Sequence, residues 1–265
     1  MTTDRRFCQT KPGLVHYVVA GPPDGVPVVL LHQTPRSCDE FAEVLALLAP
    51  EHRVVAIDTI GYGCSDRVSM QPSIADYADG VRDVLDHADI PAATLVGHHT
   101  GAFIALEVAA SYPARVSALV LSGPVFMDDE ARAALAPWFV QWHPSADGAH
   151  LHDKWSRLGR WIGDPSLRQR LLADVFRAGE TSEQGHLAIL DYPMADRLPL
   201  ICARVLLLYG RQDPFAHIAQ SYRFAERLPA TTAVELDGGV FLPTEHPAAY
   251  ARAVREFVRA SPATP

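Results

Sequence analysis

Short apolar runs alternate with stretches of helical spacing along most of the chain. The apolar runs are rich in Val, Leu, Ile and Ala, and such continuous runs are typical of strands buried on both faces of a parallel sheet. Strands that alternate with helices predict the α/β class, with a mostly parallel sheet flanked by helices. The predicted strands are 15–20, 28–31, 54–57, 93–96, 116–121, 205–208 and 233–236, and the predicted helices are 39–48, 74–87, 102–111, 218–227 and 248–259.

This alternation stops between residues 124 and 200. That stretch has no strand signal and is rich in aromatic residues, which predicts several short helices inserted between two strands. We therefore expect an α/β core domain made of residues 1–123 and 201–265, with residues 124–200 forming a helical lid, or cap. Ligands in open α/β sheets bind beyond the carboxyl ends of the strands, so the loops there are expected to line one crevice under the lid.

Composition and charge narrow the classes of function. The 265 residues carry a formal net charge of −8, and Lys11 and Lys154 are the only lysines, which argues against nucleic acid and anionic membranes as partners. The four cysteines are far apart and form no CxxC pair, as expected of a reduced, cytoplasmic protein. No apolar run approaches the roughly 20 residues of a membrane span. No apolar stretch follows the charged start, so no secretory signal is expected.

Four motifs follow predicted strands in a recognisable order. Gly97-His98-His99-Thr100-Gly101 has the frame Gly-x-Nuc-x-Gly of a nucleophile elbow, where a strand turns sharply into a helix. The other three are His32-Gln33-Thr34-Pro35, Asp58-x-x-Gly61-x-Gly63-x-Ser65 and Gly210-Arg211-Gln212-Asp213. With these motifs, most of the chain outside the lid resembles the α/β-hydrolase fold family. The resemblance is greatest to the branch of haloalkane dehalogenases, epoxide hydrolases and lid-bearing esterases.

The sequence departs from this family at three chemically important positions. The elbow residue, normally Ser, Asp or Cys, is His99. The histidine that the family carries in a Gly-Gly-His-Phe-like stretch before the last helix is replaced by Val240, and the glycine of His-Gly-x-Pro is replaced by Gln33. Only the acid, Asp213, stands in its usual place. The Ser-His-Asp route therefore lacks both its nucleophile and its base.

We interpret the histidine gained at position 99 as compensation for the histidine lost at position 240. A histidine at the elbow points into the pocket, and Val240 leaves vacant part of the space of the usual histidine ring. We expect His99 to reach Asp213 and form a His–Asp dyad that activates water or removes a substrate proton. A nucleophilic role for His99 is the weaker alternative. The resemblance also implies an oxyanion hole made of the backbone N–H groups of Thr34 and Thr100.

The expected substrate is a small molecule, apolar or aromatic, and no cofactor or metal is expected. Self-association into a homodimer is left open. His32 is expected to support its own loop as well, and His98 to lie beneath the elbow. Arg36 is expected at the surface or against an anionic substrate group, and His186 is expected to be solvated. The residues expected to line the substrate pocket are His32, Gln33, Arg36, Phe126, Trp138, Trp142 and Val240.

Three functions remain in competition. The favoured one is an enzyme that hydrolyses an ester, a lactone or a C–C bond through water activated by His99, or that catalyses a related lyase step. The alternative is a non-catalytic ligand-binding protein, or pseudoenzyme, of the same fold. A metal-dependent hydrolase using His32, His98, His99 and Asp213 is the weakest of the three, because these residues lack the spacing of a zinc motif.

Overall fold

A computed structural model describes residues 3–260, and residues 1–2 and 261–265 of the expected core domain lie outside the described residues. The sheet has eight strands in the order β1-β2-β4-β3-β5-β6-β7-β8. The pairs β1–β2 and β2–β4 are antiparallel, and all other neighbouring pairs are parallel. The strands are β1 Asp4–Gln9, β2 Leu14–Ala20, β3 Val26–Leu31, β4 His52–Ile57, β5 Ala93–His98, β6 Val116–Ser122, β7 Val205–Gly210 and β8 Thr231–Leu236.

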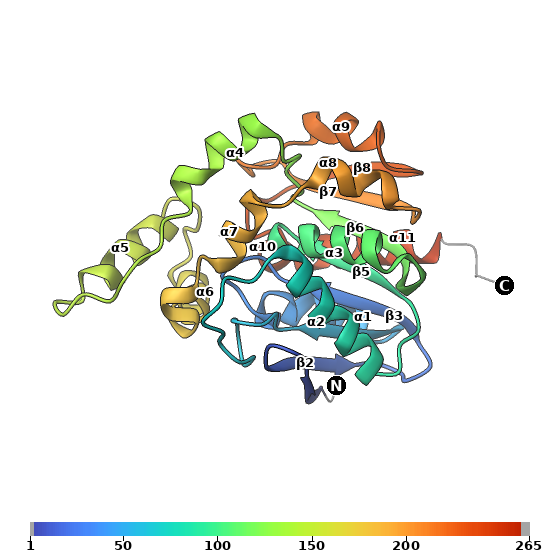
Figure 1. The fold of residues 1–265 in the computed structure, drawn as a ribbon, viewed down its shortest axis with the longest axis horizontal. Coiled ribbons are helices and arrows are strands. Elements are labelled where there is room, and N and C mark those ends of the chain that lie inside the picture. Colours follow the sequence, from blue (N-terminus) through green and yellow to red (C-terminus); the bar gives the residue numbers. More distant parts are fainter. Residues whose placement is uncertain (1–2, 261–265) are drawn as a thin grey trace.

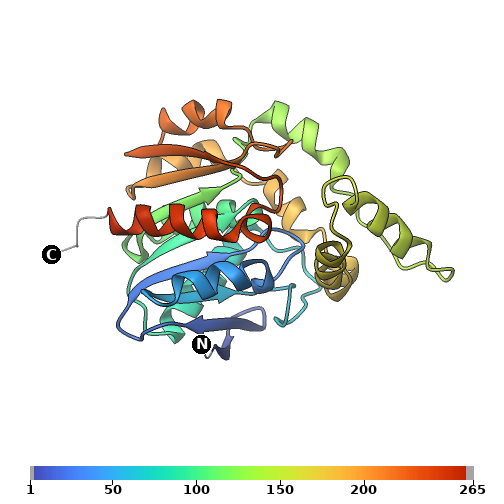
Figure 2. The ribbon, with the colours of Figure 1, turned by 180° about the vertical axis from the view of Figure 1, so that it is seen from behind.

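Helices cover both faces of this sheet. Apolar side chains of α2 (Ile74–His87) and α3 (Thr100–Ser111) share one core cluster with one face of the strands. Those of α1 (Ala42–Leu48) and α11 (Pro247–Arg259) share a second cluster with the other face. Figure 1 shows α2 and α3 in front of the sheet, and Figure 2 shows α11 and α1 from behind. The predicted α/β class and mostly parallel sheet are confirmed.

The sequence pattern misses β1 and places the other strands within a few residues. In β1 only Cys8 is buried, because the strand pairs with β2 alone at the edge of the sheet. An edge strand with charged side chains carries no apolar run, so periodicity gives no signal for it. The predicted helix at 218–227 is a 3-10 turn followed by a short helix, α9 (Ser221–Ala225).

The segment between β6 and β7, which we call the insertion (residues 124–200), is helical. Figure 1 shows α4 and α5 reaching out beyond one side of the sheet, whereas α7 lies close to it. Neither α4 nor α5 contains a buried residue, while α6 and α7 bury several. Its helices are α4 Asp129–Leu135, α5 Ala149–Leu158, α6 Pro165–Ala178, α7 Gln184–Leu190 and α8 Met194–Arg197, and the remaining short helix of the fold is α10 Leu242–Glu245.

A search of the described residues for helices with the length and apolar character of a membrane span finds none.

Candidate active site

The candidate site begins at a sharp turn between β5 and α3. His99 occupies this turn with φ 45° and ψ −108°, a backbone conformation that side chains rarely adopt. A Cβ at Gly97 would collide with the carbonyl of Gly101, and a Cβ at Gly101 would collide with the carbonyl of Leu31. The two glycines that frame His99 therefore allow the strand, the turn and the helix to pack closely.

His99 and Asp213 lie together. The Nε2 atom of His99 is 3.0 Å from Oδ2 of Asp213, which follows the end of β7. This is an ion-pair distance without the alignment of a directed hydrogen bond, and Nε2 is buried. The His99 side chain is 15% exposed and borders the cavity described below, which leaves Nδ1 as the ring nitrogen available to a ligand.

The environment tunes both groups of this pair. Burial disfavours the charged form of His99, but the negative charge and contact of Asp213, together with the charge of Glu40, outweigh burial and raise the pKa of the imidazole. Burial also opposes ionisation of Asp213. The charge and contact of His99 and the backbone N–H groups of Phe215 and Ala216 outweigh it and lower the pKa of the carboxyl. When the pair binds a proton, the proton therefore goes to the His99 imidazole and Asp213 stays a carboxylate.

Gly123 makes room for the His99 ring. It follows β6 with φ 59°, and a Cβ added there would lie 2.8 Å from Nε2 of His99 and 3.0 Å from Cε1. Both distances are shorter than ordinary contacts of a Cβ. A glycine is therefore required at this position for the imidazole to rest against the backbone after β6 and reach Asp213.

His98 and His32 are used as structural side chains. His98 Nδ1 lies 2.9 Å from the Ser122 hydroxyl on the neighbouring strand, and its Nε2 lies 2.9 Å from the carbonyl of Val240. Burial, followed by the nearby charge of His99, lowers the pKa of His98 to about 3, so this ring is neutral. His32 contacts the Gln33 carbonyl of its own loop at 2.8 Å and accepts a hydrogen bond from the backbone N–H of Thr59, in the loop after β4, at 3.0 Å. All four ring nitrogens are occupied, which leaves no lone pair directed at a shared metal.

The substituted positions 33 and 240 are joined by one hydrogen bond, and Gln33 makes two more to Glu40. The Gln33 side-chain NH₂ donates to Oε1 of Glu40 at 2.7 Å and to the Val240 carbonyl at 3.2 Å, while the Gln33 backbone N–H donates to Oε2 of Glu40. Glu40 is fully buried, and burial raises the pKa of its carboxyl to about 7 despite the opposing charge of Arg36. Gln33 is not among the described residues with positive φ, so the loop keeps a backbone that glutamine adopts freely.

The two threonines expected to supply the oxyanion donors are in contact. The backbone N–H of Thr34 points to the Thr100 hydroxyl at 3.3 Å, a long contact, and Thr100 is the first residue of α3. Gly185 of α7 packs on this pair so tightly that a Cβ there would collide with Oγ1 of Thr34 and lie 3.3 Å from Cγ2 of Thr100. The start of α7 therefore packs against the two threonines.

A cavity of about 230 Å³ opens above His99, between the core and the insertion. Four of the seven expected pocket residues border it: Gln33, Arg36, Trp138 and Val240. The rest of the lining is mostly apolar and comes largely from the insertion. It consists of Thr34, Pro35, His99, Thr100, Phe103, Val125, Met127, Leu135, Phe139, Leu158, Trp161, Leu171, Val175, His186, Ile189, Phe215 and Phe241.

The other three expected pocket residues lie outside this lining, each for a packing reason. His32 is buried in its loop by the contacts given above. Phe126 packs edge-to-face on Phe224, and the Arg223 guanidinium covers its ring. Trp142 stacks on His150 and donates its N–H to the Ser182 hydroxyl at 2.8 Å. Sequence reasoning could identify Phe126 and Trp142 as aromatic residues of the insertion, but it could not determine which way their rings point.

Arg36 is buried, contrary to the expectation of a surface position. It is 1% exposed, and its Nε donates to Oδ2 of Asp174 on α6 at 2.8 Å. The Ser37 hydroxyl donates to the other oxygen of the same carboxylate at 2.9 Å. The Arg36 charge therefore joins the loop after β3 to the insertion.

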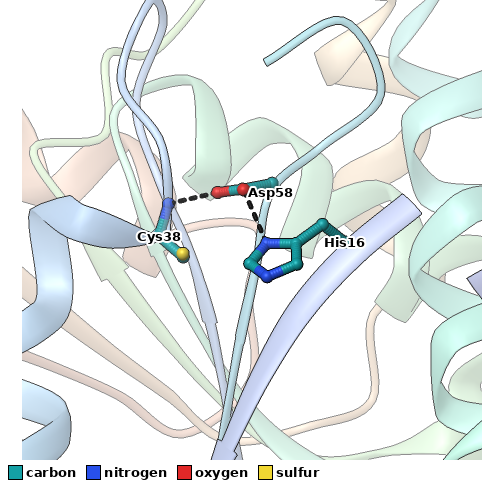
Figure 3. A group of neighbouring side chains, drawn as sticks. All are labelled: His16, Cys38 and Asp58. Atoms are coloured by element: carbon teal, nitrogen blue, oxygen red, sulfur yellow. Dashed lines mark hydrogen bonds and ion pairs between the residues drawn. The ribbon is translucent and has the colours of Figure 1, made fainter. Parts of the chain in front are cut away.

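A second histidine–carboxylate group, shown in Figure 3, lies away from the cavity. In the described part of the chain, His16, Cys38 and Asp58 form the one set of three ligand-type side chains close enough to share a metal ion. Arg5 donates to Nε2 of His16, so the ring's hydrogen is on Nδ1, directed at Asp58 2.8 Å away. Burial and the Asp58 charge raise the pKa of the Cys38 thiol, which disfavours a thiolate ligand. These donors suit a brace for the loop that begins at Asp58 better than a metal centre.

Sequence reasoning missed several residues that border the cavity or contact the residues bordering it. Glu40, Gly123 and the pair Glu183–His186 carry no motif, because each acquires its role from a neighbour distant in sequence. His186, expected to be solvated, borders the cavity and stacks on Phe139 with 4.4 Å between ring centroids. A histidine three residues after a glutamate on a short helix was the available signal.

Comparisons with known proteins agree with this architecture. The chain is 28% identical over 245 residues to the non-heme chloroperoxidase of Streptomyces lividans, covering 84% of this chain and 88% of that protein. A thermophilic esterase from Thermogutta terrifontis has a similar structure, with TM-score 0.81, 22% identity and coverage of 97% and 98% of the two chains. The enol-lactonase from Burkholderia xenovorans LB400 gives TM-score 0.77, 21% identity and coverage of 96% and 100%.

A family described as alpha/beta hydrolase fold matches residues 26–247, which include the elbow, the insertion and Asp213. The chain therefore belongs to the alpha/beta hydrolase fold family.

Proposed function

We propose that this protein is a small-molecule hydrolase in which His99, backed by Asp213, acts as a general base toward water. The observation that carries the proposal is a histidine at the elbow, with one ring nitrogen 3.0 Å from a buried carboxylate and the other available at an apolar cavity. The substrates that suit this chemistry are esters, lactones or C–C bonds next to a carbonyl. A related lyase step begins in the same way, with His99 removing a substrate proton.

The steps of the proposed hydrolysis follow from the site. Nδ1 of His99 removes a proton from a water molecule while Asp213 stabilises the imidazolium that forms. The water oxygen adds to the substrate carbonyl, and the resulting oxyanion faces the backbone N–H groups of Thr34 and Thr100. The long Thr34–Thr100 contact at 3.3 Å supports this, since a weakly held donor is readily redirected to an oxyanion.

The insertion is proposed to serve as a lid for a small apolar or aromatic substrate. Most of the apolar lining comes from the insertion, including Trp138, Phe139 and Trp161. Exclusion of water by this lining strengthens the interaction between His99, Asp213 and a developing charge.

A panel of p-nitrophenyl esters and small lactones tests the proposal. We expect His99→Ala to lower kcat/KM by about 10²- to 10⁴-fold, the usual contribution of a general base, while ligand binding persists. His143→Ala is the matched control, because His143 is 71% exposed on the insertion and does not border the cavity. A serine-directed fluorophosphonate is expected to leave the wild type unlabelled. Full activity of His99→Ala overturns the dyad.

The same panel separates the enzyme from a ligand-binding protein. Thermal-shift titration with each ester and lactone reports binding, and product analysis reports turnover. A compound that raises the Tm of the wild type and is recovered unaltered after long incubation favours the binding protein. Release of products, lost in His99→Ala, favours the hydrolase.

A further inference from the structure

A second histidine–carboxylate pair borders the same cavity from the side of the insertion. Nδ1 of His186 lies 2.8 Å from Oε2 of Glu183, three residues earlier. Both side chains are largely buried, at 23% and 10% exposure. The other oxygen of Glu183 lies 3.5 Å from the ammonium of Lys154, so this carboxylate is held on both sides.

The position of His186 relative to the elbow follows from its neighbour. Gly185 packs directly against Thr34 and Thr100, the two expected oxyanion donors. His186 and Ile189, three residues apart on α7, both border the cavity, so this face of the helix is turned toward the site. A substrate carbonyl held at the two threonines therefore lies beside the start of α7.

The ring of His186 is fixed in one orientation. Its plane stacks on Phe139 with an interplanar angle of 7°, and Nδ1 is directed at Glu183. The carboxylate selects the tautomer or charge state with hydrogen on Nδ1. Nε2 has no hydrogen-bond partner among the described residues and is not among the fully buried atoms. It is therefore the nitrogen of His186 that can contact a ligand in the cavity.

We propose that His186 is the general acid that protonates the leaving group, opposite the base His99. This inference rests on the proposed hydrolase function. As water loses a proton to Nδ1 of His99, its oxygen bonds to the acyl carbon, and the bond from that carbon to the leaving oxygen breaks. The leaving oxygen takes the proton from Nε2 of the His186 imidazolium, which keeps its second proton on Nδ1 beside the Glu183 carboxylate. His99 then returns its proton to solvent and His186 regains one, so the cycle needs no other reactant.

The test uses three acetates whose leaving groups need increasing help from an acid. p-Nitrophenolate leaves readily without a proton, phenolate less readily, and the alkoxide of benzyl acetate least readily. We expect His186→Gln to lower kcat/KM least for p-nitrophenyl acetate and most for benzyl acetate, where the loss is about 10²-fold or more, with phenyl acetate between them. Glu183→Gln is expected to give the same ordering with a smaller loss.

The matched control is His143→Gln. His143 is paired with Glu180 at 3.0 Å on the same insertion, but it is exposed and away from the cavity. We expect it to behave as the wild type on all three acetates, with circular dichroism and Tm of every variant verifying the fold. An equal effect of His186→Gln on all three acetates, or no effect, overturns this inference. If His99→Ala is inactive in the same assay, the proposed function stands.

Activity of His99→Ala equal to wild type overturns the proposed function, whatever His186→Gln does. If the wild-type protein cleaves none of the three acetates, that result contradicts, for ester substrates, both the proposed hydrolase function and the acid role of His186.

Discussion

His99 occupies an energetically unfavourable position that only its surroundings maintain. Its positive φ is strained for a residue with a side chain, and its Nε2 is buried beside a single carboxylate. Gly97, Gly101 and Gly123 each remove a Cβ that would prevent this arrangement. Strain of this kind, supported by glycines in the surrounding backbone, is typical of a functional residue.

Gly123→Ala is predicted to separate His99 from Asp213. The added methyl group would lie 2.8 Å from Nε2, so the imidazole must move away from the carboxylate. A displacement of about 1 Å at a reacting group lowers activity by about 10²-fold. The measurement is kcat/KM on the best ester or lactone of the panel, together with the Tm.

Gly148→Ala controls for the backbone effect of an alanine at positive φ. Gly148 has φ 74° on the insertion, and a Cβ there makes only an ordinary contact at 3.8 Å with Leu151. Both variants carry strain of about 1–2 kcal/mol from the left-handed conformation. Equal activity losses in the two variants would show that the loss reflects strain rather than displacement of His99.

Among the elements, those that build the elbow were predictable from sequence. The apolar run at 93–96 and the glycines around His99 predict the turn between β5 and α3, because strand, glycine and helix signals are all local. The contact between His99 and Asp213 was predictable because the elbow motif and the Gly-x-x-Asp motif each follow a strand of the same parallel sheet. Asp213 is 1% exposed at the carboxyl end of β7, where the sheet brings it beside the elbow.

Contacts between the core and the insertion were not predictable. The structure buries Arg36 against Asp174, 138 positions away, although an isolated arginine after a Pro indicates a surface loop. Phe126 and Trp142 turn away from the cavity because partners within or near the insertion cover them. Hydrophobic periodicity reports which residues are buried and not which neighbour they contact.

The Arg36–Asp174 pair is predicted to hold α6 against the loop after β3. Both side chains are buried. Arg36→Met leaves the Asp174 carboxylate without its cation, and Asp174→Asn removes the nearest carboxylate of Arg36, whose other two, Asp39 and Glu40, lie at 3.4 and 4.0 Å. Loss of one partner of such a pair destabilises a protein by about 3–5 kcal/mol. The double variant Arg36→Met/Asp174→Leu is expected to recover much of that loss. Urea unfolding gives the free energy of unfolding of the two single variants and the double variant. A decrease in that free energy of less than about 1 kcal/mol in both single variants contradicts this role.

At the scale of the whole molecule, the site lies between two parts of different packing. The central strands β3, β5, β6 and β7 are buried almost throughout, whereas α4 and α5 contain no buried residue. Figure 1 shows these two helices at one side of the sheet. One wall of the cavity therefore comes from loops and α3 beside densely packed strands, and part of the other wall, Leu135 and Leu158, comes from α4 and α5, which contain no buried residue.

Hydrogen exchange is predicted to follow this division. Amides of α4 and α5 are expected to exchange fastest among the helices, and those of β5, β6 and β7 slowest, because local opening of these two helices exposes little buried surface. Exchange measured by mass spectrometry on the full chain tests this. Protection of α4 and α5 equal to that of the central strands would contradict it.

The pKa of the His99 imidazole, followed by NMR titration in the wild type and in Asp213→Asn, tests the central claim most directly. Asp213 favours the protonated ring, so the wild-type pKa is expected above the ordinary value of about 6.5. Removal of its charge is expected to lower the pKa and to move the rising limb of kcat/KM toward lower pH, with a smaller maximum. A His99 pKa and pH profile unchanged by Asp213→Asn would contradict the account.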